Sequence, residues 1–266
     1  MAPARPADYR AIWMAKPVLR NVYQGWYRRM AKACRAGRTL EIGGGSGNFK
    51  SFAPDVISTD IMTAAWLDAV CDAHRLPFDE ASFDNIVMFD VLHHLQRPAL
   101  FFREAMRVLR ADGRIVMLEP AITPVSHVFY DRFHAEPVNM TEDPFADGPL
   151  DTGRDPFDSN QAIPTLLFGG MARQAAFEKA FPGLSVDMAE YLALFAYPLT
   201  GGFQSWSLLP AWLAGPLTAL ENILAPVLGR SMAFRMLIVI SLKRSYRMPG
   251  QESLTVDYQK NRWLRS

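Results

Sequence analysis

A run of glycines directly after a short apolar segment is the first candidate for a binding site in this chain. Gly43, Gly44, Gly45 and Gly47 follow the segment that ends at Ile42. Glycine lets the backbone turn sharply between a strand and a helix, and it lets a ligand approach without meeting a Cβ atom. The run therefore predicts a ligand cradle, with a tight turn that binds nothing as the alternative.

The residue at position 48 discriminates between two kinds of nucleotide ligand. The dinucleotide fingerprint G-x-G-x-x-G, counted from Gly43, requires a glycine where this chain has Asn48. The run therefore favours a nucleoside over a pyrophosphate-bearing cofactor, which argues against a nicotinamide dehydrogenase.

Asp60 ends the next apolar segment, seventeen residues after Gly43. A carboxylate at that place can accept hydrogen bonds from the two hydroxyls of a ribose. The alternative is an ordinary cap in front of a helix. Because Asp60 and the glycine run fall at neighbouring strand ends of one βαβ unit, each strengthens the interpretation of the other.

Strands and helices alternate along the part of the chain that would position these residues. This alternation predicts a parallel sheet with helices on both faces. A long ordered loop is expected from Pro120 to Pro164, where the periodic pattern is lost. We expect strands at 38–42, 56–60, 67–71, 83–89, 114–118, 184–194 and 236–242, with helices at 17–35, from Pro98 onward and at 167–180.

Six motifs in order resemble the class I S-adenosylmethionine-dependent methyltransferases, and within them the type 11, ubiquinone/menaquinone methyltransferase-like group. The resemblance covers about residues 38–120 and concerns the cofactor, not the substrate. It implies a doubly wound, mostly parallel seven-stranded sheet of order 3-2-1-4-5-7-6, with strand seven antiparallel. The motifs are Leu-Glu-Ile-Gly-Gly-Gly-Ser-Gly up to Gly47, Asp60, Asp-Ala-x-x-Leu-Pro-Phe from Asp72, Ser82-Phe-Asp84, Val91-Leu-His-His-Leu95 and Arg107-Val-Leu-Arg-Ala-Asp-Gly-Arg114.

The resemblance implies that S-adenosyl-L-methionine is the cofactor and assigns a role to each matching residue. The methionine end would lie against Glu41, Gly43 and Gly45, and the ribose hydroxyls against Asp60. The adenine would contact Asp72 and Ala73, and the sulfonium and acceptor would be bordered by Phe89 and Asp90.

Two departures from the family pattern are visible. Only eleven residues separate Asp60 from Asp72, so the usual second helix is nearly absent and a more open adenine pocket is expected. The common Pro-Gly-Gly before strand five is replaced by Ala111-Asp-Gly113, which predicts a different turn at that place.

Methyl transfer is an in-line displacement, and an oxygen or nitrogen acceptor needs a nearby group to take its proton. The catalytic candidates are His127, Asp131 and His134 on the segment after strand five; surface histidines are the alternative. Two separate cysteines, Cys34 and Cys71, indicate neither a disulfide framework nor a zinc site, so no metal is expected. Further candidates for the acceptor side are Glu119, Tyr130, one of His93 and His94, and a substrate wall at Asn160 and Gln161 that could equally be a capped loop.

An apolar insert at 196–234 has only Glu221 and Arg230 as charges. Its prolines and glycines predict broken helices that cannot span a bilayer. The insert could complete the core, cover an apolar acceptor as a lid, or lie in a membrane interface. The last possibility would be aided by a basic tail at 244–266; from Lys243 onward there are six basic and two acidic side chains.

Composition limits the remaining classes of function. The 28 basic and 27 acidic residues leave a net charge of +1, so binding to nucleic acid is not expected. We expect a helical cap at 1–37, a cofactor-binding domain at 38–243 with substrate-side segments at 121–183, and a cytoplasmic location with peripheral membrane contact. The expected function is methyl transfer to a small or lipid-linked apolar acceptor; the alternative is a non-catalytic accessory protein that binds the cofactor.

Overall fold

The computed structural model describes residues 6–133 and 136–246. Its strands form one sheet of order β3-β2-β1-β4-β5-β7-β6, and β7 runs antiparallel to both of its neighbours, which confirms the predicted topology. The other strand pairs are parallel. The strands are β1 (Thr39–Ile42), β2 (Ile57–Asp60), β3 (Ala69–Val70), β4 (Phe83–Phe89), β5 (Leu109–Pro120), β6 (Leu184–Leu192) and β7 (Arg235–Leu242).

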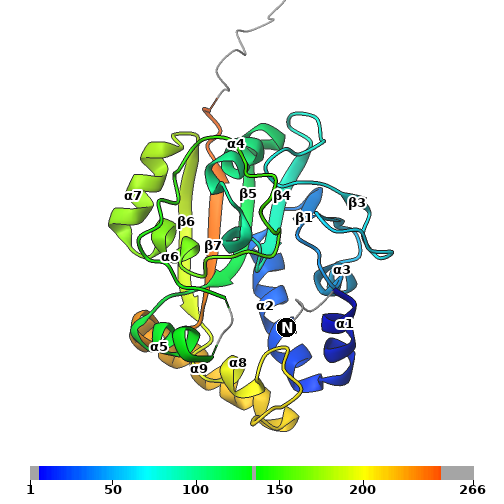
Figure 1. The fold of residues 1–266 in the computed structure, drawn as a ribbon, viewed down its shortest axis with the longest axis vertical. Coiled ribbons are helices and arrows are strands. Elements are labelled where there is room, and N and C mark those ends of the chain that lie inside the picture. The colour runs from blue at the N-terminus through cyan, green and yellow to red at the C-terminus, as the bar shows by residue number, and fades with distance from the viewer. Residues whose placement is uncertain (1–5, 134–135, 247–266) are drawn as a thin grey trace, which may run out of the picture.

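Helices cover both faces of this sheet (Figure 1). On one face α4, α6 and α7 pack against the strands, and on the other α2, α8 and α9 do so. The helices are α1 (Pro6–Ala15), α2 (Pro17–Ala33), α3 (Asn48–Phe52), η1 (Leu92–His94, a 3-10 turn), α4 (Pro98–Val108), α5 (Pro124–Phe133), α6 (Ile163–Phe168), α7 (Met171–Ala180), α8 (Ala196–Thr200) and α9 (Ala211–Met232).

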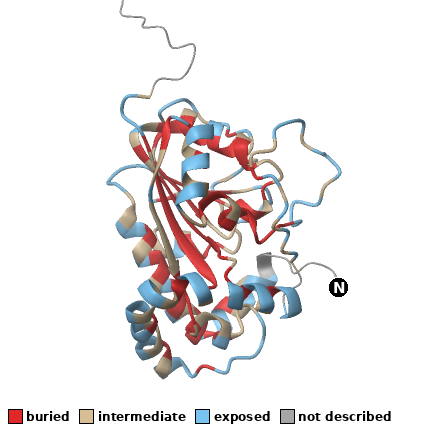
Figure 2. Cartoon of the chain, turned by 90° about the vertical axis from the view of Figure 1, so that its left-hand side faces the viewer, coloured by how far each residue is buried: buried red, intermediate tan, exposed pale blue. Residues whose placement is uncertain are grey.

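The central strands are buried on both sides, as Figure 2 shows by colour. Their side chains alternate between two clusters because successive residues of a strand point to opposite faces. Ile86 and Met88 pack under α4, α6 and α7, whereas Val87, which lies between them, packs under α2. Strands covered on both faces therefore appear in the sequence as continuous apolar runs.

Three predicted elements are wrong in their extent. The loop expected from Pro120 to Pro164 contains α5, which begins where Thr123 Oγ1 accepts the backbone N–H of Ser126. The helix expected at 167–180 is two helices, because Gly170 adopts φ +127° between them. The turn expected at Asp112-Gly113 is an irregularity within β5, which begins at Leu109.

The apolar insert also differs from its prediction. Residues 211–232 form one continuous helix, α9, which accommodates Pro216 and Pro226. Most of this helix faces solvent, so the backbone carbonyls that lose a hydrogen bond at the two prolines can tilt outward and bond to water. Between β2 and β3 the described residues 61–68 contain no helix, as expected from the short spacing.

The carboxyl ends of β1, β2, β4 and β5 meet at one edge of the sheet, where α1, α2, α5, α8 and α9 also gather (Figure 1, lower part). A buried lysine joins the N-terminal helices to the insert there. Lys16 Nζ donates hydrogen bonds of 2.7–2.8 Å to the carbonyls of Gly202, Gln204 and Trp206. Candidate site residues from distant parts of the sequence are thus held at one end of the molecule.

Candidate active site

The loop after β1 has the backbone geometry of a ligand cradle. Gly43 and Gly45 adopt φ +71° and +47°, a region that other residues occupy at a cost. A Cβ on Gly43 would lie 2.1 Å from Val91 Cγ2, so the loop is in close contact with the segment after β4. A Cβ on Gly45 would meet nothing nearer than the Gly43 carbonyl at 3.8 Å, so the space over Gly45 is open.

Glu41 provides a buried carboxyl group directly under this loop. Its side chain is 4% exposed, and its Oε2 has no hydrogen-bond partner among the described residues. Burial raises the pKa of Glu41 to about 7, although Ser58 and Lys50 oppose the shift. A buried carboxylate oxygen without a partner is costly, so the site is suited to a cationic group such as an α-ammonium.

Asp60 joins the end of β2 to the glycine loop. Its Oδ2 accepts the backbone N–H of Gly45 at 2.8 Å, and its Oδ1 accepts that of Met62 at 2.9 Å. A carboxylate has about four acceptor positions, and Asp60 is partly exposed. Each oxygen can therefore accept a further hydrogen bond from a ribose hydroxyl while it holds the loop.

The residues assigned to the adenine follow β3. Asp72 Oδ1 accepts the backbone N–H of His74 at 2.9 Å and contacts His74 Nδ1 at 2.6 Å. The Asp72 side chain remains 40% exposed, while Ala73 is buried. This leaves Asp72 accessible to a ligand amino group, with the small Ala73 beside it.

Two side chains that the sequence analysis missed cover the loop from outside. Trp66 Nε1 donates to the Gly45 carbonyl at 2.8 Å, and Arg10 Nη1 donates to the Ser46 carbonyl at 2.7 Å. The Arg10 guanidinium lies 4.6 Å from the centre of the Trp66 ring. The N-terminal helix α1 thus contributes to the shape of the cradle, although nothing in its sequence indicates such a contact.

Phe89 and Asp90, which end β4, lie beside an aromatic group. The ring of Phe89 stacks on Tyr23 of α2 at 4.9 Å, with an interplanar angle of 28°. Asp90 has φ +58° and forms an ion pair with Arg235, whose Nη2 donates to the Tyr197 hydroxyl at 2.8 Å. Trp26, Tyr27 and Phe203 complete the aromatic group.

The charges of the Asp90–Arg235 pair are set by burial and by each other. Burial raises the pKa of the Asp90 carboxyl, and Arg235 opposes this shift. Burial would lower the pKa of Arg235, but Asp90 raises it well above its usual range. The sequence analysis missed Arg235, although it is the one charged residue in an otherwise apolar strand.

A second polar group lies at the ends of β4 and β5. His93 is buried, and its Nδ1 lies 2.8 Å from Glu119 Oε2, while its Nε2 lies 3.4 Å from Glu136 Oε2. Burial alone would lower the pKa of His93, but the two carboxylates raise it to about 10. Burial and the neighbouring His93 lower the pKa of His94 to about 4. The structure thus joins Glu119 and His93, which were separate candidates, with Glu136, which was not predicted.

Two of the predicted catalytic residues, His127 and Asp131, lie on α5 and, among the described residues, make no hydrogen bond or ion pair with this group. His127 and Asp131 are exposed on α5, whereas Tyr130 is buried, and its hydroxyl donates to the Phe234 carbonyl at 3.0 Å. His134 lies outside the described residues. Catalytic roles for His127, Asp131 and His134 stay predictions.

The loop at 159–161 forms a wall behind His93. The Asn160 backbone N–H donates to the His93 carbonyl at 2.8 Å, and Gln161 Nε2 donates to Glu136. The Asn160 side chain bonds to Asn139 and Glu142. Both side chains therefore support the polar group, and contact with a substrate stays a prediction.

Residues 40–117 match the family model described as a methyltransferase domain. The chain contains a class I methyltransferase domain. The matched segment of this methyltransferase domain runs from β1 into β5, and it includes the open space over Gly45, the Asp60 carboxylate and the residues that end β4.

Several named proteins are similar to the chain. It is 31% identical over 137 residues to a probable S-adenosylmethionine-dependent methyltransferase of Mycobacterium tuberculosis, covering 45% of this chain and 50% of that one. It is 34% identical over 103 residues to a demethylmenaquinone methyltransferase of Roseiflexus castenholzii, covering 32% and 43%. A structure of a SAM-dependent methyltransferase from Archaeoglobus fulgidus has a TM-score of 0.49 and 15% identity, over 84% and 94%. The chain spans about half the length of the curated relatives it matches.

Proposed function

We propose that the protein transfers a methyl group from S-adenosylmethionine to an apolar acceptor, either small or lipid-linked. The observation that carries the cofactor is the buried Glu41 carboxyl, whose Oε2 lies under Gly44 without a hydrogen-bond partner within bonding distance among the described residues, next to the open space at Gly45. The cofactor has a cationic amino-acid end and a nucleoside end. Glu41 of β1 suits the first, and Asp60 at the end of the neighbouring strand β2 suits the second. The names of the relatives support the same cofactor and an enzyme.

Each residue of the site would then have a defined task. When bound, S-adenosylmethionine supplies an electrophilic methyl group on a sulfonium. Glu41 would hold the α-ammonium, Asp60 the ribose hydroxyls, and Asp72 the adenine amino group. The protein mainly binds, aligns and excludes water, because the cofactor carries the reactive group.

The aromatic group supports an apolar acceptor. Tyr23, Trp26 and Phe89 pack their rings together where β4 ends, and Tyr197 joins the group from α8. Tyr23 and Trp26 are 2% and 4% exposed, so an acceptor would meet the partly exposed edge of the group at Phe89 and Tyr197. Aromatic faces bind apolar molecules through large buried areas, and they also attract a cationic sulfonium. A water-soluble, strongly charged acceptor would find few partners on these rings.

The outer surface of the same end supports a membrane-associated acceptor. Trp212, Ile223 and Val227 on α9 are 76%, 74% and 81% exposed. Val128 and Phe133 on α5, which packs beside α9, are also exposed. Exposed apolar side chains in such a group indicate contact with a partner or with lipid. We call the exposed apolar residues of α5, α9 and the loop 206–208 the apolar surface.

The anchoring of α9 favours contact along a membrane over passage through one. Among the described residues, α9 is the one helix long and apolar enough to cross a bilayer, with a mean hydropathy of 1.3. However, Glu221 of α9 is buried and accepts the backbone N–H of Phe195 and Ala196. Gly229 packs against Tyr191, where a Cβ would lie 2.8 Å from Tyr191 Cβ. One stripe of α9 is thus joined to the domain, and the rest remains free to lie in an interface.

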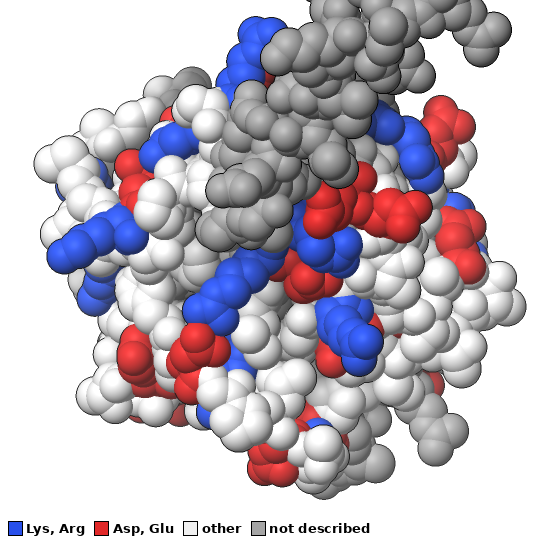
Figure 3. All heavy atoms as spheres, turned by 90° about the horizontal axis from the view of Figure 1, so that it is seen from above, with Lys and Arg blue, Asp and Glu red and all other residues white. Residues whose placement is uncertain are grey.

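The predicted help of the basic tail stays a prediction, because most of the tail lies outside the described residues. Helix α9 comes directly before the first residue of β7, and Lys243 and Arg244 come directly after its last residue. The two basic residues therefore lie at the opposite end of the sheet from the apolar surface. Seen from that opposite end, basic and acidic side chains are intermixed (Figure 3). Residues 247–266 lie outside the described residues. We propose that the protein is located in the cytoplasm and contacts the membrane peripherally. Among the described residues, this contact rests on the apolar surface.

The decisive experiment uses S-adenosylmethionine labelled in its methyl group. Incubation with a lipid extract and with a polar metabolite extract should yield S-adenosylhomocysteine, with the label appearing in the lipid fraction. Label in the polar fraction alone would overturn the apolar acceptor. Cofactor binding without any S-adenosylhomocysteine formation would instead support the accessory-protein alternative.

A further inference from the structure

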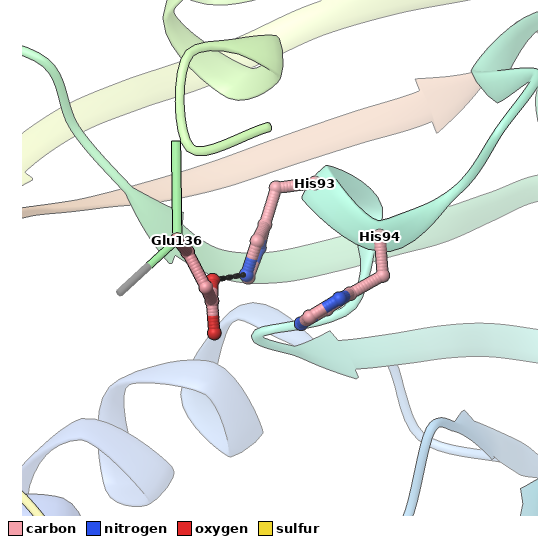
Figure 4. Close-up of side chains that lie close together, drawn as sticks. All are labelled: His93, His94 and Glu136. Carbon is pink, nitrogen blue, oxygen red and sulfur yellow. Dashed lines mark ion pairs between the residues drawn. The ribbon is translucent and has the colours of Figure 1, made fainter. Parts of the chain in front are cut away.

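Two adjacent histidines and a glutamate direct their side chains toward one point beside the strand ends. His93 and His94 lie on η1, directly after β4, and Glu136 lies on the segment after α5 (Figure 4). One donor atom from each residue lies within 4.8 Å of the other two. Imidazole nitrogens and a carboxylate oxygen in this number are a common ligand set for a transition metal.

The separation between His93 and Glu136 is compatible with two ligands of one ion, which would displace the proton that otherwise lies on His93 Nε2. His93 Nε2 lies 3.4 Å from Glu136 Oε2. Hydrogen bonds between nitrogen and oxygen usually measure about 2.7–3.2 Å. Two ligands that are each about 2.0–2.1 Å from a tetrahedral zinc ion lie roughly 3.3 Å apart.

The other ring nitrogen of His93 is held as metal-binding histidines usually are. Its Nδ1 lies 2.8 Å from Glu119 Oε2, and Glu119 Oε1 accepts the backbone N–H groups of Val91 and Leu92, each at 2.9 Å. A carboxylate at this position fixes the ring and directs Nε2 toward the ion. Glu119 is fully buried, so this support is rigid.

The remaining two ligands are also prepared. Ser159 Oγ donates to Glu136 Oε2 at 3.0 Å, and Gln161 Nε2 donates to the same oxygen, which orients the carboxylate. His94 Nδ1 is buried and has no hydrogen-bond partner among the described residues.

We infer that His93, His94 and Glu136 form a binding site for a divalent cation of zinc-like softness, with Glu119 orienting His93. Two imidazoles and one carboxylate leave a coordination position for water, as in zinc sites with an open position. Magnesium prefers oxygen ligands, so this set disfavours it. The sequence analysis expected no metal because it relied on cysteine spacing. The inference is independent of the proposed function, since the metal can bind whether or not methyl transfer occurs.

The test measures metal binding to tag-free, chelator-treated full-length protein. Calorimetric titration with Zn²⁺ should give about one bound ion per chain, and Co²⁺ should develop visible absorption bands of a nitrogen-containing site. Mg²⁺ should bind far more weakly. His94→Gln and Glu136→Gln each remove one ligand and should abolish the stoichiometric step. Glu119→Gln keeps all three ligands and should weaken Zn²⁺ binding about 10–100-fold.

Matched variants separate this site from general surface binding. His127→Gln removes an exposed imidazole and Glu190→Gln a partly exposed carboxylate, both outside the cluster, and neither should change Zn²⁺ binding. Circular dichroism and S-adenosylhomocysteine affinity verify that each variant is folded. A wild-type protein that binds less than stoichiometric Zn²⁺, or folded His94→Gln and Glu136→Gln variants that bind it as the wild type does, would overturn the inference.

Discussion

The Arg235 guanidinium at the start of β7 pairs with the Asp90 carboxylate after β4, across the end of β5 that lies between these strands. The two side chains are 6% and 29% exposed, so both charges are largely removed from water. Arg235 also lies 4.6 Å from the centre of the Tyr197 ring. This pair fixes the position of Asp90, which adopts a left-handed backbone conformation beside the expected acceptor.

Removing one partner of this pair should destabilise the protein strongly. Arg235→Met leaves the Asp90 carboxylate buried without its cation, and such a loss costs about 3–5 kcal/mol. Urea unfolding should show the change in the free energy of unfolding. Arg29→Met breaks the exposed pair with Glu190, whose side chains are 34% and 39% exposed, and should cost at most about 1 kcal/mol. If Arg235→Met and Arg29→Met lowered the free energy of unfolding equally, the importance of burial for the Asp90–Arg235 pair would be contradicted.

Glu41 should make the stability of the cofactor-free protein depend on pH. Burial raises its pKa from 4.5 to about 7, so between these values the folded protein binds more protons than the unfolded chain. Stability therefore falls as pH rises from about 4.5 to about 7, by up to about 3 kcal/mol from this group. Glu41→Gln should lose that part of the pH dependence and be the more stable protein at pH 8. If the free energy of unfolding changed with pH in the same way in the wild type and in Glu41→Gln, the raised pKa of Glu41 would be ruled out.

Asp60→Ala should weaken the binding of S-adenosylhomocysteine at least about 100-fold. Two charge-assisted hydrogen bonds to the ribose would be lost, each worth about 1.5–3 kcal/mol. The Gly45 N–H would also lose its acceptor. Calorimetry should show the loss, and Asp187→Ala, which removes an exposed carboxylate on β6, should bind normally. Unchanged affinity in folded Asp60→Ala would refute the ribose assignment.

Gly45→Val should abolish binding while most of the fold remains. The space that its side chain would enter is open in the protein but lies where the cofactor is expected. The φ of +47° adds a penalty of about 1–2 kcal/mol for a residue with a Cβ. Gly25→Ala on α2, where a Cβ meets nothing within 4 Å, is the control and should preserve both stability and binding. Normal binding by folded Gly45→Val would place the cofactor elsewhere.

The sequence predicted the cofactor half of the fold because its signals are local. Strand β4 contains an apolar run, Gly43 directly follows β1, and Asp60 ends β2, so the neighbouring strand ends could be inferred. The sheet order came from the family resemblance, and β7 and β6 follow it. The cofactor roles of Glu41, Gly45 and Asp72 remain predictions that the geometry accommodates.

The acceptor half could not be predicted because its contacts are distant in sequence. Asp90 and Arg235 are 145 positions apart, and no local pattern joins them. Glu136 lies in a segment that was expected to be an irregular loop. Helix α9 was expected to be broken because Pro216 and Pro226 remove backbone donors, but it is continuous, and Glu221 joins it to the backbone of Ala196.

The apolar surface should bind lipid vesicles through α9. Trp212 and Ile223 are 76% and 74% exposed, so changing both to Ser removes apolar area without opening the core. Burying such a side chain in lipid is worth about 1.5–3 kcal/mol, and the double variant should therefore bind vesicles at least about 10-fold more weakly. Flotation with phosphatidylcholine vesicles, with and without anionic lipid, measures this. Since Lys243 and Arg244 lie at the other end of the sheet, the anionic lipid should add little.

Met171→Ser is the control for this prediction. Met171 begins α7 and is 83% exposed, a fraction similar to the 76% of Trp212, but it belongs to neither α5 nor α9. If exposure alone determined vesicle binding, Met171→Ser would weaken it as well. We expect this variant to float as the wild type does, because a single exposed side chain outside a group is common on protein surfaces. Vesicle binding that survives the loss of Trp212 and Ile223 would exclude α9 as the contact. Binding that requires anionic lipid and is lost when the salt concentration is raised would indicate the basic segment instead.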